Sequence, residues 1–261
     1  MAENIEQRKE YAVSGNLYSQ VNSMNPSIDI GFIVQTMKMS LRYLPATLLL
    51  SFVPFLVSFL FGTLFALARM FKVPFFARFC SLFIVIIRGI PVVLLLFIFY
   101  YAIYGGIDVL AKSFDWKVAS KDFSPLFIAI IALSVNGTVY LAETMRSALL
   151  AVDKGQMEAA YSIGMTTTQG LMRFVFPQAI PKALPNLCNN LTATVKSASL
   201  AFTISVVDLL NGALLYASSN YKYLEAYVAA AILYWLLCYL IDKTLQWLEK
   251  RFNLQAERTT L

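Results

Sequence analysis

The order of apolar and charged positions divides the chain into long uncharged stretches separated by short charged segments. A helix that crosses the hydrocarbon core of a bilayer takes about 20 apolar residues, because each residue adds about 1.5 Å. Five stretches approach or exceed that length, and the middle of the fourth is polar and contains Lys196. The pattern therefore predicts an all-α integral membrane protein with about five transmembrane helices. The predicted spans cover residues 44–68, 89–107 with a backward extension through 79–87, 123–142, 183–207 and 226–241.

The distribution of Lys and Arg predicts how these spans are oriented. Short cytoplasmic loops carry an excess of these two residues. The segments after the first, third and fifth spans are basic, whereas acids balance the bases in the loops after the second and fourth. We therefore predict an N-terminus outside and a C-terminus inside, although Lys38 and Arg42 beside the first span oppose this assignment. The basic residues are Arg69, Lys72 and Arg78, then Arg146, Lys154, Arg173 and Lys182, and then Lys243, Lys250, Arg251 and Arg258.

The polar start of the chain predicts a segment outside the bilayer. Residues 1–28 are rich in Asn, Ser, Gln and Glu, and they lack the apolar region and cleavage site of a signal peptide. Residues 30–41 have an amphipathic pattern that favours a helix lying along the interface. The predicted organisation is an extracytoplasmic arm with this interfacial segment over residues 1–42, a transmembrane domain over 43–252 and a cytoplasmic tail over 253–261.

Composition narrows the class of protein further. Of the 261 residues, 59% are hydrophobic and 14% are charged, against roughly 45–50% and about 25% in soluble domains. A soluble chain of this size could not bury so much apolar surface, so composition excludes a soluble domain and a disordered chain. The chain has no His, and its three Cys lie inside apolar stretches, so no metal site is expected. The net charge of +6 comes from residues at the ends of spans, which does not favour nucleic-acid binding.

The segment between the third and fourth spans, about residues 153–182, contains signals for a short helix. Asp153 can cap a helix over residues 156–163, with the Gln156 side chain reaching back. Gly164 tolerates a positive φ and is predicted to end this helix. Thr166 and the two threonines after it favour a turn or a new N-cap. Three prolines, Pro177, Pro181 and Pro185, are predicted to mark the return to the membrane. From these residues alone, a plain interfacial loop stays an open alternative.

The residues of this segment resemble the EAA loop of ABC importer permeases. Glu158, Ala159 and Ala160 are followed after three residues by Gly164, and Pro177 follows at the family spacing. Phe174 and Phe176 replace the usual aliphatic pair. RGIP over residues 88–91, VNGTVYLAETMRSALLAVDKGQMEAA over residues 135–160 and KSASL over residues 196–200 are similar to motifs of the polar amino-acid permeases. The resemblance covers about residues 44–252. Ser197, Ala198 and Leu95 stand where that family usually has Asp, Thr and Gln.

The resemblance implies the permease subunit of a type I ATP-driven importer for amino acids. A second permease, the same or a homologous chain, completes the translocation path. The helix with Glu158, Ala159, Ala160 and Gly164 docks on a dimer of cytoplasmic ABC ATPase subunits, which bind ATP and Mg²⁺. An extracytoplasmic binding protein delivers the substrate. This chain has no G-x-x-x-x-G-K-[ST] phosphate loop, so we expect no ATPase activity and no cofactor of its own. The implied location is the bacterial plasma (inner) membrane.

Polar and ionisable residues inside the predicted spans are the candidates for the substrate path. Ionisable groups are costly in a bilayer and usually face the bundle interior or a water-filled cavity. Lys196 lies in the middle of its span, which favours a path role over an ion pair or a snorkelling side chain. Ser and Thr can line the path, but they also bond the carbonyls of their own helix. The candidates are Lys196, Ser199, Thr203, Tyr140, Glu143, Arg88 and Asp208.

Several of these candidates have a structural alternative. Glu143 and Arg146 are three residues apart on one helix, so we expect them to pair with each other. Arg88, beside a glycine and a proline, is expected to fix the start of the second span. Asp208 lies near the outer end of the fourth span and can pair with Lys222.

Two other classes of function compete with an importer subunit. A stand-alone secondary transporter or channel for small polar solutes would explain the charges, but it leaves the segment over 153–182 without a purpose. A membrane enzyme has little to work with, because the chain lacks His and clustered carboxylates. A bound amino acid needs a counter-charge for each of its charged groups. The loss of the usual acid beside Lys196 favours a neutral polar amino acid, with cystine possible, over a cationic one.

Overall fold

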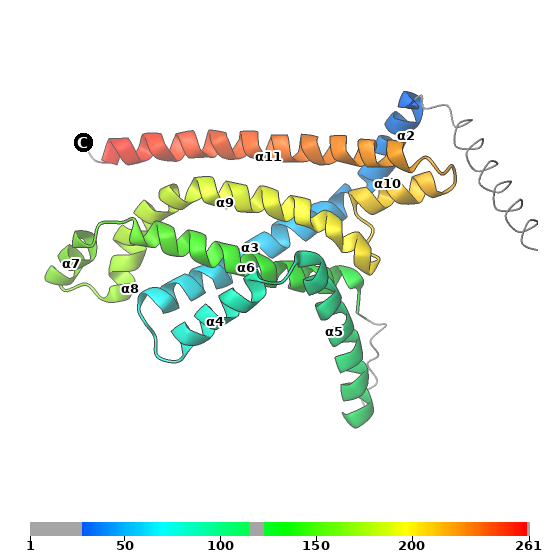
Figure 1. The fold of residues 1–261 in the computed structure, drawn as a ribbon. Coiled ribbons are helices and arrows are strands. Elements are labelled where there is room, and N and C mark those ends of the chain that lie inside the picture. The colour runs from blue at the N-terminus through cyan, green and yellow to red at the C-terminus, as the bar shows by residue number, and fades with distance from the viewer. Residues whose placement is uncertain (1–27, 115–122, 260–261) are drawn as a thin grey trace, which may run out of the picture.

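The computed structural model describes residues 28–114 and 123–259, and every regular element in those ranges is helical (Figure 1). The all-helical architecture predicted from the sequence is thus confirmed. The elements η1 and η4 are 3₁₀ turns and η3 is a π-helical turn. In chain order the elements are α2 (Ile30–Ser40), η1 (Leu41–Tyr43), α3 (Leu44–Met70), α4 (Phe76–Arg88), α5 (Val92–Phe114), α6 (Pro125–Leu150), α7 (Gly155–Ser162), α8 (Thr167–Gly170), η3 (Leu171–Val175), α9 (Phe176–Ala198), η4 (Ser199–Ile204), α10 (Leu209–Ser218) and α11 (Tyr223–Thr259).

In the described part of the chain, four helical stretches are long and apolar enough to cross a membrane, and a bent pair supplies a fifth. The four are Ile30–Met70, which joins α2, η1 and α3, then α5, α6 and the stretch Tyr223–Trp247 of α11. The bent pair is the stretch Thr167–Ile204 followed by α10, with an angle of 45° between them. This agrees with the predicted number of spans, and the bend falls in the span whose middle is polar.

The predicted backward extension of the second span is wrong. Residues 79–87 belong to α4, which ends at Arg88, and α5 begins only after Pro91. The N–H of Gly89 closes α4 on the carbonyl of Ile86 at 3.2 Å, and the residue before a proline is driven out of the helical region. The helix α4 therefore packs against α3 and α6 instead of prolonging α5. Arg88 ends α4 and does not start the second span.

The predicted fourth span over 183–207 is followed by a break at its outer end and then by a further helix, α10, which the sequence did not indicate. After η4, Ser205 adopts a left-handed backbone conformation (φ 64°), which stops the helix. Asp208 then starts α10, because its carboxylate accepts a hydrogen bond from the N–H of Asn211 at 2.9 Å. The prolines predicted to mark the return to the membrane lie within α9, the helix that leads back into the bundle. Pro177 occupies its first turn, where a missing N–H is not needed, and Pro181 and Pro185 lie in its interior.

The centre of the bundle is formed by α3, which packs along α6. Small residues allow the two backbones to approach closely. A Cβ built on Gly62 of α3 would lie 2.8 Å from the backbone nitrogen of Ala142 in α6. Near the middle of the two helices, the hydroxyl of Ser58 donates to the carbonyl of Ser134 at 2.8 Å. The position of Gly62 therefore leaves no room for a side chain.

The helix α2 continues through η1 into α3 and packs against α10 and α11. The Asp29 carboxylate caps α2 by accepting from the N–H of Phe32 at 2.9 Å, and it pairs with the Lys222 ammonium at 2.6 Å. The hydrogen bond from Lys222 lowers the pKa of Asp29, and the same bond raises the pKa of Lys222. The predicted interfacial segment is thus helical, but its depth in a bilayer stays a prediction. Residues 1–27 of the predicted arm lie outside the described residues.

The two ends of the bundle carry different elements (Figure 1). The helix α7 and the last turns of α11 lie at one end, whereas α2 and the connection from α10 to α11 lie at the other. The predicted orientation requires the C-terminus to lie on the same side as the segment over 153–182, which we call the coupling segment, and the two do share one end of the bundle. Which end faces the cytoplasm stays a prediction. The predicted tail over 253–261 begins inside α11, which continues to Thr259.

Candidate functional site

The helix α7 begins close to the predicted position. The Asp153 carboxylate accepts a hydrogen bond from the N–H of Gly155 at 2.7 Å, but the N-cap residue is Lys154, and its side chain makes no capping hydrogen bond. The predicted return of the Gln156 side chain to Asp153 is not formed. Instead, the side-chain oxygen of Gln156 accepts from the amide of Gln178 in α9 at 3.2 Å. This bond ties α7 to the helix that leads back into the bundle.

The end of α7 is the end predicted from the sequence. Gly164 has a φ of 78°, a conformation that disfavours a side chain, and its N–H donates to the carbonyl of Tyr161 at 2.9 Å. Thr166 is the new N-cap: its hydroxyl accepts from the N–H of Gln169 at 3.3 Å, and the Gln169 side chain accepts from the N–H of Thr166 at 2.9 Å. This capping box starts α8. The segment is therefore a helix–turn–helix with defined helix ends, and not an irregular loop.

The two alanines of α7 have different surroundings. Ala160 is buried against α8, where a Cβ built on Gly170 would lie 3.2 Å from the Ala160 Cβ. Glu158 and Ala159 are exposed, as are the apolar side chains of Tyr161 (48%) and Ile163 (68%). Among the described residues, no side chain bonds or pairs with the Glu158 carboxylate. Together these four exposed residues form what we call the docking face.

A polar cavity of about 200 Å³ lies between α6 and α9. Asn136 and Ser197 face it, and in the described part of the chain neither side chain has a hydrogen-bond partner. Asn190 also lines it and donates to Thr144 at 3.2 Å. The full lining is Val92, Leu133, Asn136, Gly137, Tyr140, Asn190, Ala193, Thr194 and Ser197. Unpartnered amide and hydroxyl groups are available to a small polar solute.

Of the predicted path residues, Tyr140 lines this cavity and Arg88 lies next to it. The Arg88 guanidinium carbon is 6.0 Å from the centre of the Tyr140 ring, within the range of a cation–π interaction. The sequence analysis did not single out Asn136, which lines the same cavity. It also gave no role to Asn190, Thr194 and Ser197, although their spacing along α9 places them on one face.

Lys196 lies on a different face of α9. It borders a second cavity of about 410 Å³, between α9 and α11, together with Tyr234, Trp235 and Asp242. The Asp242 carboxylate accepts a hydrogen bond from the Thr192 hydroxyl at 2.8 Å. The structure thus separates Lys196 from Tyr140 by placing them at two cavities on either side of α9. The path role of Lys196 stays a prediction.

Glu143 pairs with a different arginine from the predicted one. Its carboxylate accepts a hydrogen bond from Arg69 of α3 at 2.6 Å, and the predicted pair with Arg146 is not formed. The reason is the close packing of α3 on α6, which brings Arg69 nearer than the neighbour on the same helix. This pair links two spans and gives Glu143 a structural contact.

Asp208 also has a different partner from the predicted one. It is fully buried and accepts a hydrogen bond from the Tyr234 hydroxyl of α11, whereas Lys222 pairs with Asp29. Ser199 and Thr203 donate to carbonyls of their own helix, those of Lys196 and Leu200, both at 2.7 Å. Neither hydroxyl lines the polar cavity. Among the described residues, no three His, Cys, Asp or Glu side chains group as metal ligands would.

Comparison with known proteins gives a family for this arrangement. The sequence pattern of the family described as binding-protein-dependent transport system inner membrane component matches residues 58–254. The chain is 33% identical over 225 residues to PatM of Vibrio harveyi, a probable amino-acid ABC transporter permease protein, and the match covers 86% of this chain and 96% of PatM. The matched residues run from α3 to α11 and include both α7 and the polar cavity.

Two further likenesses cover a similar share of the chain. TcyL of Bacillus subtilis (strain 168), an L-cystine transport system permease protein, is 33% identical over 236 residues, which are 90% of this chain and 96% of TcyL. A chain in the crystal structure of an amino acid ABC transporter with histidines is 29% identical, with a TM-score of 0.71. That match covers 86% of this chain and 99% of the solved chain.

Proposed function

Because the chain belongs to the family of binding-protein-dependent transport system inner membrane components, we propose that it is the permease subunit of an ATP-driven importer of amino acids. The observation that carries this proposal is α7, whose docking face is exposed and holds an unpartnered Glu158. A stand-alone transporter or channel has no use for such a face, and no relative named above is of that class.

We infer that the chain works as one half of a transport path in the bacterial inner membrane. A second permease, the same or a homologous chain, forms the other half, and an extracytoplasmic binding protein delivers the substrate. Each α7 docks on one subunit of a cytoplasmic ATPase dimer, and those subunits bind ATP and Mg²⁺. This chain has no phosphate loop, which supports the proposal that the partner subunits hydrolyse the ATP needed for uphill transport while this chain forms the path.

The packing around α7 supports a route from ATP hydrolysis to the path. Met157 of α7 contacts the apolar cluster that includes Leu149 of α6, Leu171 of η3 and Ala179 of α9. A close-packed cluster moves as a unit, so a displacement of α7 carries α6 and α9 with it. The polar cavity lies between those same two helices. Docking-driven motion of α7 would therefore carry both walls of the cavity together, relative to the second permease.

The polar cavity is our proposed substrate path. Its volume of about 200 Å³ is below the roughly 300–1,000 Å³ of pockets for drug-sized ligands, which suits a small solute. Arg88 beside Tyr140 supplies a cation for the substrate carboxylate. Asn136 and Ser197 supply hydrogen bonds. None of the cavity's lining residues named above is acidic, which favours a neutral polar amino acid, or cystine, over a cationic one.

The function is tested with the reconstituted complex of permease, ATPase and binding protein. A panel of amino acids is offered, and ATP hydrolysis and uptake are measured together. We expect stimulation of ATP hydrolysis by neutral polar amino acids or cystine, with uptake that stops when ATP is withheld. Uptake that continues without ATP would support the stand-alone transporter, and preferential stimulation by Lys or Arg would contradict the neutral substrate class.

The path is tested by Asn136→Leu. Leucine has a similar size but cannot hydrogen-bond, and an unpaired polar site in a binding pocket lowers affinity strongly. We expect substrate-stimulated ATP hydrolysis to fall about tenfold or more while the complex still assembles. Asn189→Leu is the matched control, because Asn189 is exposed on α9 and lies outside the polar cavity. A larger loss in Lys196→Met than in Asn136→Leu would move the path to the cavity between α9 and α11.

A further inference from the structure

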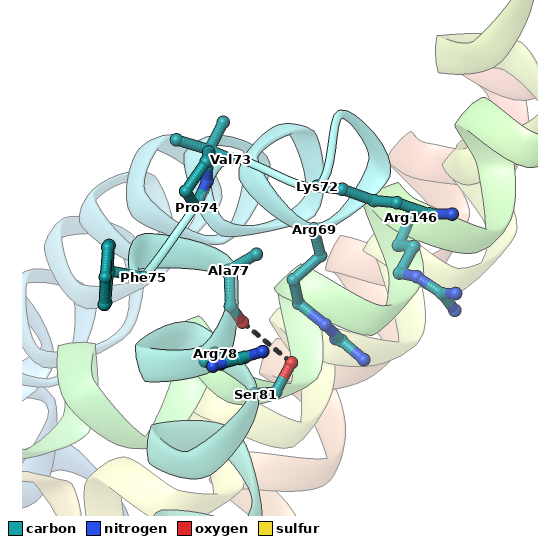
Figure 2. Close-up of a pocket in the computed structure, with 9 residues that line it drawn as sticks. All are labelled: Arg69, Lys72, Val73, Pro74, Phe75, Ala77, Arg78, Ser81 and Arg146. Atoms are coloured by element: carbon teal, nitrogen blue, oxygen red, sulfur yellow. Dashed lines mark hydrogen bonds between the residues drawn. The ribbon is translucent and has the colours of Figure 1, made fainter.

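Four cations gather around a hollow at the end of α3. Arg69 lies in the last turn of α3, Lys72 follows in the connection, Arg78 lies in the first turn of α4, and Arg146 lies near the end of α6. They line a pocket of about 600 Å³, which we call the basic pocket. Figure 2 shows these side chains reaching the hollow from three helices and the connecting loop, with the Ser81 hydroxyl beside Arg78.

The positive charge of the basic pocket is only partly balanced. Glu143 neutralises Arg69 through their 2.6 Å ion pair. Within residues 28–114 and 123–259, no Asp or Glu forms an ion pair with Lys72, Arg78 or Arg146. Four cations therefore face one carboxylate. The like charges repel one another, and a bound anion relieves that repulsion. The anion is attracted by all four cations at once.

The surface beside the basic pocket is apolar and exposed. Phe75, which lines the pocket, is 85% exposed. On α4, Phe79 and Leu82 are 54% and 61% exposed. Lys72 and Phe75 also have positive φ angles (50° and 60°), which are costly for side-chain-bearing residues and tend to be kept at functional sites. A cationic pocket thus adjoins an apolar surface at the end of a membrane span.

We propose that the basic pocket binds the phosphodiester headgroup of an anionic phospholipid, whose acyl chains lie along the exposed apolar surface of α4. Basic pockets between helices at the cytoplasmic side of a membrane suit anionic headgroups, and Arg pairs well with phosphate oxygens. The connection between α3 and α4, which contributes Lys72 and Phe75 to the pocket, lies toward the end of the bundle that carries α7, where the basic loops predict the cytoplasm (Figure 1). An apolar surface next to the cations distinguishes a lipid from free phosphate, because free phosphate gains nothing from it.

The experiment is a titration of the intact, delipidated complex in a neutral detergent with short-chain phosphatidylglycerol, followed by native mass spectrometry. Parallel titrations use short-chain phosphatidylcholine and inorganic phosphate. We expect saturable binding of phosphatidylglycerol and little binding of phosphatidylcholine. Each cation near a membrane surface contributes enough attraction to change affinity about fivefold. Arg78→Gln should therefore weaken phosphatidylglycerol binding about fivefold, and Lys72→Gln with Arg78→Gln should weaken it on the order of twentyfold.

The matched control is Arg173→Gln, which removes one exposed cation of the coupling segment outside the basic pocket. It should leave phosphatidylglycerol binding within about twofold of wild type. Equal loss in Arg173→Gln and Arg78→Gln would overturn the site in favour of diffuse attraction. Binding of inorganic phosphate as tight as that of phosphatidylglycerol would overturn the lipid assignment. Loss of the ATPase subunit in Arg78→Gln without loss of lipid would assign the pocket to a protein partner instead.

Discussion

Replacing Gly164 by Asp is expected to stop ATP-dependent uptake and to lower the amount of retained ATPase subunit about tenfold or more. Gly164 ends α7 in a left-handed conformation, and a Cβ built on it meets no atom within 4 Å. Asp tolerates this conformation better than most residues, so the backbone strain is about 1 kcal/mol. An unpaired carboxylate at a docking interface costs several kcal/mol. The loss should therefore come from docking and not from the fold of the permease.

Gly164→Asn separates the charge from the strain. Asn has nearly the same size and conformational preference as Asp but no charge, so it should retain most of the ATPase subunit. Glu158→Ala should act in the same direction as Gly164→Asp, because it removes the charge-assisted contact that Glu158 makes across the docking interface. The measurements are the ATPase subunit that co-purifies with tagged permease, the level of permease in the membrane, and uptake. Wild-type retention and uptake in Gly164→Asp would show that α7 is not the element that docks on the ATPase.

The coupling segment could be predicted in detail because its signals are local. A glycine that ends a helix, or a threonine that starts one, acts on residues within one turn. Gly164 and Thr166 accordingly do what the sequence indicates. Gln156 does not, because Gln178 of α9 lies close enough to compete for it. Helix ends can thus be predicted from neighbouring residues, unless a side chain from a second helix competes for the same hydrogen bond.

The partners of charged side chains could not be predicted, because they depend on which helices pack together. Glu143 pairs with Arg69, which is 74 positions away in the sequence, and Lys222 pairs with Asp29, which is 193 positions away. A prediction that considers only neighbours along the sequence pairs Glu143 with Arg146 and Lys222 with Asp208, and both pairs are wrong. For the same reason, the polar stripe of α9 is visible in the sequence, but Asn136 of α6 opposite it is not.

The number of spans could be predicted from apolar length alone, whereas the breaks within them could not. Ser205 takes a left-handed conformation that few residues other than glycine adopt. Because a serine and not a glycine stands there, the sequence gives no signal for the break before α10. The break between α4 and α5 had a signal, since Pro91 disfavours a helical residue before it. An uncharged stretch can thus hide a turn, because hydropathy reports burial in lipid and not the direction of the chain.

Replacing Gly62 by Leu is expected to prevent assembly of the permease. The backbones of α3 and α6 approach closely here: a Cβ at position 62 would lie 2.8 Å from the Ala142 nitrogen and 2.9 Å from the Leu141 carbonyl carbon. These are backbone atoms of α6, so no rotamer change can relieve the overlap, and α6 itself must move away. Overpacking of a tight core costs roughly 1–3 kcal/mol or more. Because α6 lines the polar cavity and leads to α7, such a shift removes both transport and docking.

Gly105→Leu is the matched control, since Gly105 lies in α5 and a Cβ there meets no atom within 4 Å. In that open helical position, leucine replaces the poorer helix former and should be neutral or slightly stabilising. Both variants are compared by the height of the monodisperse peak in size-exclusion chromatography and by the ATPase subunit that co-elutes. We expect Gly62→Leu to lose most of the peak, whereas Gly105→Leu keeps it. Equal peaks would mean that α3 and α6 tolerate a side chain between them, which contradicts the small-residue contact at the centre of this bundle.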